Sequence, residues 1–138
     1  MKTAVDTSVL LDVFSADPAF GEASREALRK AYDSGALVAS DVVWAEVRAN
    51  FLSEEAFAAA IDSLGIRFDP TSQAAASLGG QFWASRRSAK GSKASRERVV
   101  ADFLVGAHAM LQADALLARD RGYYREHFKG LRVIDPNK

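Results

Sequence analysis

Four acidic residues stand at positions where a solvated carboxylate is not expected, namely Asp6, Glu46, Asp102 and Asp120. Asp6 directly follows the short stretch KTAV, and Asp120 comes two residues after the stretch ALLA. Both stretches are typical of buried strands, and in open parallel sheets ligands bind beyond the carboxyl ends of the strands. We therefore expect Asp6 and Asp120 to emerge at one edge of a sheet. Each could instead act only as a helix cap or a turn residue.

Glu46 and Asp102 lie in helical patterns. Val43 and Val47 define the apolar stripe of a predicted helix, which places Glu46 on or beside the face that packs against the sheet. Asp102 lies in VVADFLVGAHAM, a helix that is apolar nearly all round and is expected to be largely buried. An unpaired buried carboxylate is costly, so each of these acids needs a metal, another cation or a salt bridge. Arg98, one turn before Asp102, is the candidate for a purely structural pair.

Four carboxylates at one sheet edge repel one another unless a cation lies between them. Hard oxygen ligands of this kind suit Mg²⁺ or Mn²⁺, and such ions can polarise a phosphate and lower the pKa of a bound water. The chain offers little other catalytic chemistry, since it has no cysteine and no GxxxxGK[ST] phosphate loop. Of its two histidines, His108 is expected to be a packing residue and His127 a surface residue near a helix end.

The elements that position these acids alternate along the chain. Strands are predicted at 2–5, 36–39, 66–68, 115–118 and 131–134. Helices are predicted at 8–14, 18–34, 41–52, 54–64, 72–87, 99–112 and 123–128, with a small, polar loop at 88–95. Strands that alternate with helices indicate a parallel sheet with helices on both faces. We expect residues 1–138 to form a single three-layer α/β domain.

The motifs around the four acids resemble those of the PIN-domain family. They are VDTSVLLD at the start, WAEVRANF, VVADFLVGAHA and LLARDRGYYREHF, in the family's order and spacing over essentially the whole chain. Within the family, the sequence looks most like the VapC toxins of toxin–antitoxin modules. The resemblance implies a Mg²⁺- or Mn²⁺-dependent ribonuclease that pairs with a small antitoxin and forms a homodimer. One departure is Ala118, which stands where the family often has Thr or Ser.

The resemblance also assigns roles to the acids. It makes Asp6 and Asp102 the direct metal ligands, with Glu46 and Asp120 completing the pocket. The expected reaction is hydrolysis of an RNA phosphodiester bond by a water in line with the leaving oxygen. The sequence shows no signal peptide and no apolar stretch of the roughly 20 residues that would span a bilayer, so a cytoplasmic protein is expected.

An acidic pocket repels RNA, so positive charge is needed nearby. The segment 86–98 holds six basic residues and one acid, a net charge of +5 in a chain whose total is zero, so the rest carries −5. RNA contacts are therefore predicted from this segment and from the arginines beside the fourth acid, namely Arg86, Arg87, Lys90, Lys93, Arg119 and Arg121. A solvated surface loop is the alternative explanation of the segment.

Two other functions compete with the nuclease. A non-catalytic RNA-binding or interaction module would use the acids in structural ion pairs, so the test is whether they cluster without basic partners. A haloacid-dehalogenase-like phosphatase needs a second Asp where this chain has Ser8, and a receiver domain needs paired acids that are missing.

Five phenylalanine and tryptophan residues between positions 11 and 64 are more than the small core of those helices obviously needs. They could line a groove for an amphipathic antitoxin helix, or all could belong to the core. They are Phe14, Phe20, Trp44, Phe51 and Phe57.

Overall fold

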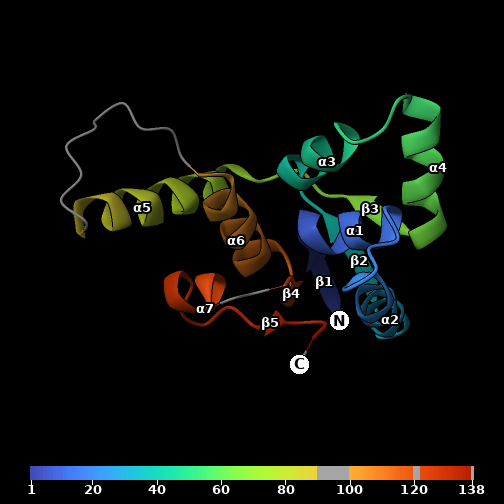
Figure 1. The fold of residues 1–138 in the computed structure, drawn as a ribbon. Helices are drawn as coiled ribbons and strands as arrows, with labels where there is room; N and C mark the ends of the chain where they lie inside the picture. Colours follow the sequence, from blue (N-terminus) through green and yellow to red (C-terminus); the bar gives the residue numbers. More distant parts are fainter. Residues whose placement is uncertain (90–99, 120–121, 138) are drawn as a thin grey trace.

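The computed structural model describes residues 1–89, 100–119 and 122–137 (Figure 1). Its strands are β1 (Lys2–Val5), β2 (Ala36–Ala39), β3 (Ile66–Phe68), β4 (Ala115–Leu117) and β5 (Val133–Ile134). Its helices are α1 (Thr7–Phe14), α2 (Gly21–Asp33), α3 (Asp41–Arg48), α4 (Glu54–Leu64), α5 (Gln73–Ala89), α6 (Ala101–Gln112) and α7 (Tyr123–His127).

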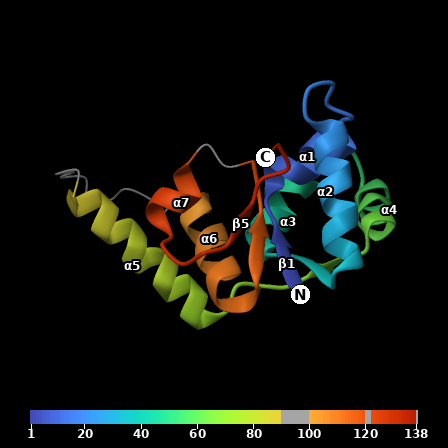
Figure 2. The same cartoon turned by 90° about the horizontal axis from the view of Figure 1, so that it is seen from below.

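The strands form one parallel sheet in the order β3-β2-β1-β4-β5. The central strand β1 pairs with β2 on one side and with β4 on the other, so that Thr3 lies opposite both Leu37 and Ala115. Helices α2 and α4 lie on one side of the strands and α5, α6 and α7 on the other (Figures 1 and 2). The predicted three-layer α/β fold is therefore confirmed.

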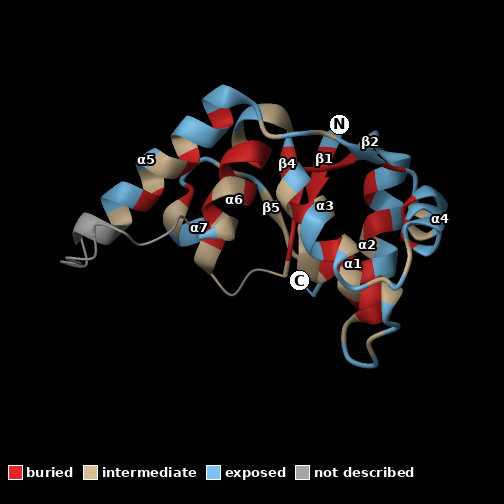
Figure 3. Ribbon diagram, turned by 90° about the horizontal axis from the view of Figure 1, so that it is seen from above, coloured by how far each residue is buried: buried red, intermediate tan, exposed pale blue. Residues whose placement is uncertain are grey.

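The core follows from this layering. Strands β1 and β4 are covered on both faces, so Thr3–Val5 and Ala115–Leu117 are buried without alternation, and all of them except Thr3 are apolar. Figure 3 shows the buried residues gathered on the central strands and on the helix surfaces that face them. Phe57 and Phe103 are among the largest fully buried side chains and lie on helices of the two opposite layers.

Local hydrogen bonds explain where the helices begin and end. Ser40 and Ser53 accept from the backbone N–H groups of Val43 and Ala56, which makes them the N-caps of α3 and α4. Gly65, which ends α4, has the left-handed φ of +67° that favours glycine at this position. The loop predicted at 88–95 begins later than expected, because α5 continues to Ala89, and the rest of it lies outside the described residues.

Two helices, α2 and α3, are each four residues shorter than predicted. Helix α2 begins at Gly21 because Asp17 Oδ1 accepts from the N–H groups of Ala19 and Phe20, which forms a separate turn before the helix. Helix α3 ends at Arg48, four residues before the predicted end. The Arg48 guanidinium donates to the Phe51 carbonyl oxygen, so the chain turns away there instead of continuing the helix.

Candidate active site at the carboxyl edge of the sheet

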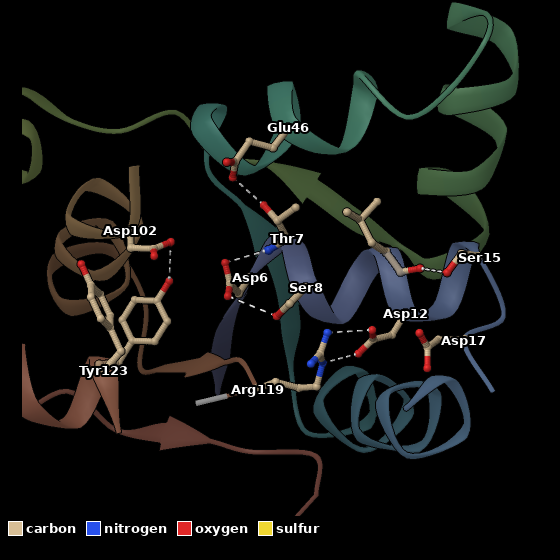
Figure 4. Close-up of a pocket in the computed structure, with 12 residues that line it drawn as sticks. Asp6, Thr7, Ser8, Asp12, Ser15, Asp17, Glu46, Asp102, Arg119 and Tyr123 are labelled. Carbon is tan, nitrogen blue, oxygen red and sulfur yellow. Dashed lines mark hydrogen bonds and ion pairs between the residues drawn. The ribbon is translucent and has the colours of Figure 1, made fainter. Parts of the chain in front are cut away.

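A pocket of about 650 Å³ lies beyond the carboxyl end of β1, beside the point where the strand order changes direction between β1 and β4. This is the place where open parallel sheets bind ligands. Three of the four acids predicted from the sequence, Asp6, Glu46 and Asp102, line it. Figure 4 shows Asp6 at the start of α1, with Glu46 on α3 above it and Asp102 on α6 to its left. Asp120, the fourth, lies outside the described residues.

Asp6 is both a helix cap and a pocket residue. Its backbone is extended, and its Oδ1 accepts from the Thr7 N–H at 2.8 Å, which makes it the N-cap of α1. Its Oδ2 accepts from the Ser8 hydroxyl at 3.3 Å. The cap and the pocket role, which the sequence left as alternatives, are therefore compatible.

Glu46 lies beside the buried stripe of α3, as expected, but its side chain is exposed and lines the pocket. Val43 and Val47 form that stripe, and Glu46 stands one position before Val47. Its Oε1 accepts from the Thr7 hydroxyl at 2.7 Å. This bond joins α3 to α1 beside Asp6.

Asp102 lies in the first turn of α6 and is only partly buried, whereas the sequence indicated a largely buried residue. The buried stretch of this helix starts at Phe103 and continues through Ala109, so the acid stands where the helix enters the core. The Tyr124 hydroxyl donates to Asp102 Oδ1 at 3.4 Å. Arg98, the candidate for a structural pair, falls outside the described residues.

The acids raise one another's pKa values. Burial, the nearby charge of Asp102 and, more weakly, that of Glu46 raise the pKa of Asp6 to about 6, against hydrogen bonds from Thr7 and Ser8 that lower it. Burial and the charge of Glu46 also raise the pKa of Asp102. None of the basic side chains in the described parts of the chain forms an ion pair with these three acids.

Hard divalent cations suit this set of donors, which consists of carboxylate oxygens held by neutral hydrogen-bond donors. Within the described ranges, no three acidic or histidine side chains are close enough together to form a ready-made metal cluster.

The sequence analysis missed two acids of this pocket, Asp12 and Asp17. Asp12 on α1 is 3% exposed and accepts from Arg119 Nε at 2.7 Å and Nη2 at 3.1 Å. The Ser24 hydroxyl adds a third bond at 2.9 Å, and the Arg119 guanidinium lies 4.2 Å from the centre of the Phe20 ring. A lone acid in the apolar run VLLDVF was the signal that could have revealed this pair. Arg119, predicted as an RNA contact, thus has its charge paired with Asp12.

The histidines lie away from these acids. His108 is 1% exposed, and its Nε2 lies 2.9 Å from Asp69 Oδ2, which confirms it as a packing residue. His127 is partly buried rather than at the surface, because its ring packs against Tyr123 and Phe103.

Comparison with known proteins agrees with this geometry. The sequence model of the PIN domain matches residues 3–128, so the chain belongs to the PIN-domain family. No curated protein sequence matches it. In the described residues, no helix is long and apolar enough to cross a bilayer.

Solved structures share the fold over nearly their full lengths. VapBC2 of Rickettsia felis, bound to a DNA fragment from its promoter, is 15% identical to this chain with a TM-score of 0.72, and the match covers 98% of each chain. VapBC-1 of nontypeable Haemophilus influenzae is 20% identical with a TM-score of 0.70, covering 100% of each chain. VapC20 of Mycobacterium tuberculosis, a sarcin-ricin loop cleaving toxin, is 19% identical with a TM-score of 0.57, covering 94% of this chain and 98% of its own.

Proposed function

We propose that this protein is a metal-dependent endoribonuclease that hydrolyses RNA phosphodiester bonds. One observation carries the proposal: Asp6, Glu46 and Asp102, from three separate elements, line one pocket without a cationic partner among the described side chains. Membership of the PIN-domain family and the sarcin-ricin loop cleavage named for the M. tuberculosis neighbour support it.

In the alternative function, a binding module, the acids would form ion pairs with basic side chains. Asp12 in this same pocket is an example of such a pair, because its buried carboxylate accepts two hydrogen bonds from one arginine. Among the described side chains, Asp6, Glu46 and Asp102 accept from neutral donors only. Their charge therefore remains available to an external cation.

In the proposed site, Asp6 and Asp102 would hold Mg²⁺ or Mn²⁺, with Glu46 and Asp120 completing the pocket. When bound, such an ion polarises the phosphate and lowers the pKa of a water. Thr7 and Ser8 orient the carboxylates of Glu46 and Asp6 without neutralising them. The direct test is incubation with candidate RNAs in Mn²⁺, in Mg²⁺ and in EDTA. Cleavage in EDTA equal to that in Mn²⁺ would overturn the proposal.

Positive charge beside the pocket would bind the RNA backbone. Arg86 on α5 lies 5.7 Å from the centre of the Trp83 ring, and its charge acts on Tyr123, which lines the pocket. The side chain of Arg87 and all of Lys90, Lys93 and Arg121 fall outside the described part. They remain predicted contacts.

Changing Arg86, Arg87, Lys90 and Lys93 to Ser should weaken RNA binding and flatten its salt dependence. Each lost phosphate contact removes about 0.7 from the slope of log K against log salt for a single strand. Fluorescence anisotropy at several salt concentrations measures this slope. As a control, Arg25→Ser/Lys30→Ser removes two exposed charges from α2, on the other side of the sheet. An equal slope change per charge in both variants would contradict a specific role of segment 86–98.

We further propose that the protein is the toxin of a VapBC-type pair, a homodimer inhibited by a small antitoxin. The VapBC complexes among its structural neighbours support this. Of the five aromatic residues considered for the antitoxin groove, Phe57 belongs to the core, and four are partly exposed. Edge contacts of 5.3 to 5.7 Å join four of the five into one cluster, which comprises Phe14, Trp44, Phe51 and Phe57.

Co-expression tests the partner. The product of an adjacent small gene should co-purify with the wild-type chain and suppress RNA cleavage. Replacing the partly exposed Trp44 by Ala should weaken this complex, whereas Tyr32→Ala, at an exposed position on α2, should not. A complex that survives Trp44→Ala unchanged would place the antitoxin elsewhere.

A further inference from the structure

Each of the three described catalytic candidates accepts a hydrogen bond from a hydroxyl. For Asp6 and Glu46 the donors are Ser8 and Thr7, which directly follow Asp6 in the chain. For Asp102 the donor is Tyr124, which lies 22 residues further along and on another helix. The position of Asp102 therefore depends on how α7 packs against α6.

Tyr124 is held firmly enough to serve as such a support. It is 4% exposed, and its ring packs against the rings of Tyr123 and Phe128 with centroid distances of 5.5 and 6.1 Å. Phe128 is itself 1% exposed and contacts Phe103, the residue next to Asp102 on α6. The hydroxyl thus projects from a packed aromatic cluster toward a partly exposed carboxylate.

In the described residues, the β4 side of the pocket offers Asp102 no other donor. Ala118, directly after β4, is fully buried and has no hydroxyl. The one arginine that lines the pocket in the described residues, Arg119, is engaged by Asp12. Among the described side chains, Tyr124 is therefore the hydrogen-bond donor to Asp102.

We propose that Tyr124 is a positioning residue, whose hydroxyl holds the Asp102 carboxylate in the orientation that binds a divalent cation. This inference rests on the proposed metal-dependent function, because Asp102 is one of its assigned ligands. Outer hydrogen-bond partners of metal ligands typically change metal affinity by 10- to 100-fold when they are removed.

The test compares Tyr124→Phe with Tyr123→Phe, using Mn²⁺ affinity measured by isothermal titration calorimetry. Tyr123 is the adjacent residue, lines the same pocket and makes no hydrogen bond to the described acids, so it is a matched control. Tyr124→Phe should weaken Mn²⁺ binding about 10- to 100-fold, and Tyr123→Phe should leave it within about twofold of wild type. Wild-type affinity in Tyr124→Phe, or equal losses in both variants, would overturn the proposal.

A double-mutant cycle shows whether Tyr124 acts through Asp102. In an Asp102→Asn background, Tyr124→Phe should cause no further loss of Mn²⁺ affinity. Additive losses of Mn²⁺ affinity would overturn the proposal. A Tyr124→Phe protein that circular dichroism shows to be unfolded would also overturn it, because the hydroxyl would then be needed for the fold. RNA cleavage by the same samples separates the two claims. Wild-type protein that binds Mn²⁺ in a Tyr124-dependent way but cuts no RNA would refute only the proposed nuclease.

Discussion

Replacing Asp6 or Asp102 by Asn is expected to reduce metal-dependent RNA cleavage by on the order of 10³-fold while the fold survives. A bound metal ion stabilises the transition state of phosphoryl chemistry by several kcal/mol. Each 1.36 kcal/mol corresponds to a tenfold change in rate, so loss of the ion should slow cleavage by on the order of 10³-fold. Asn keeps the shape of the side chain but removes the charge that would hold the ion. Single-turnover cleavage at saturating Mn²⁺, with circular dichroism to verify folding, measures the effect.

Asp62→Asn is the control for this experiment. Asp62 is an exposed acid on α4 that does not line the acidic pocket, so its loss should leave the cleavage rate unchanged. Wild-type rates in both Asp6→Asn and Asp102→Asn would refute the assignment of the pocket as the catalytic centre.

The pocket should also destabilise the metal-free protein. The pKa of Asp6 rises from its ordinary 3.8 to about 6 in the folded state, so the native protein holds an extra proton between these values. Unfolding is then favoured as pH rises through this window, and the free energy of unfolding falls by on the order of 3 kcal/mol between about pH 4 and 6 from this group. Divalent metal should restore roughly 2.7 kcal/mol at about 100 times its dissociation constant.

Asp102→Asn tests this directly, because it removes one of the charges that raise the pKa of Asp6. In EDTA at pH 7 the variant should melt higher than wild type, and it should gain less from Mn²⁺. Its stability should also fall less steeply between pH 4 and 6. A lower melting temperature of Asp102→Asn in EDTA would instead indicate a structural ion pair, since Asn would leave a buried cation unpaired.

The order of strands and helices could be predicted because the sequence patterns that indicate them are local and recur along the chain. Short apolar strands alternate with capped helices, and Ser40, Ser53 and Gly65 mark helix ends through their own side-chain or backbone chemistry. The errors arise where a side chain bonds to the backbone outside its helix, as Asp17 and Arg48 do. Such bonds depend on the path of the chain, which helical periodicity does not encode.

The site was predictable in composition but not in exposure. Asp6, Glu46 and Asp102 do line one pocket, yet Glu46 is exposed and Asp102 only partly buried. Periodicity assigns a residue to a face of a helix, but the depth of burial depends on which neighbour covers that face. The pair between Asp12 and Arg119 was missed for a related reason, since its partners are separated by 107 residues.

The central position of β1 determines when the acidic pocket can form during synthesis. Residues 2–68 contain β1, β2 and β3, so the emerging chain can build three of the five strands while one edge of β1 still lacks its partner β4. Asp6 is then already in place, but Asp102 and Tyr124 have not yet been translated. Because domains are synthesised from the N-terminus, the acidic pocket closes only after Tyr124 has been added. A truncated product would expose an unpaired strand edge instead of a finished pocket, and such edges promote aggregation.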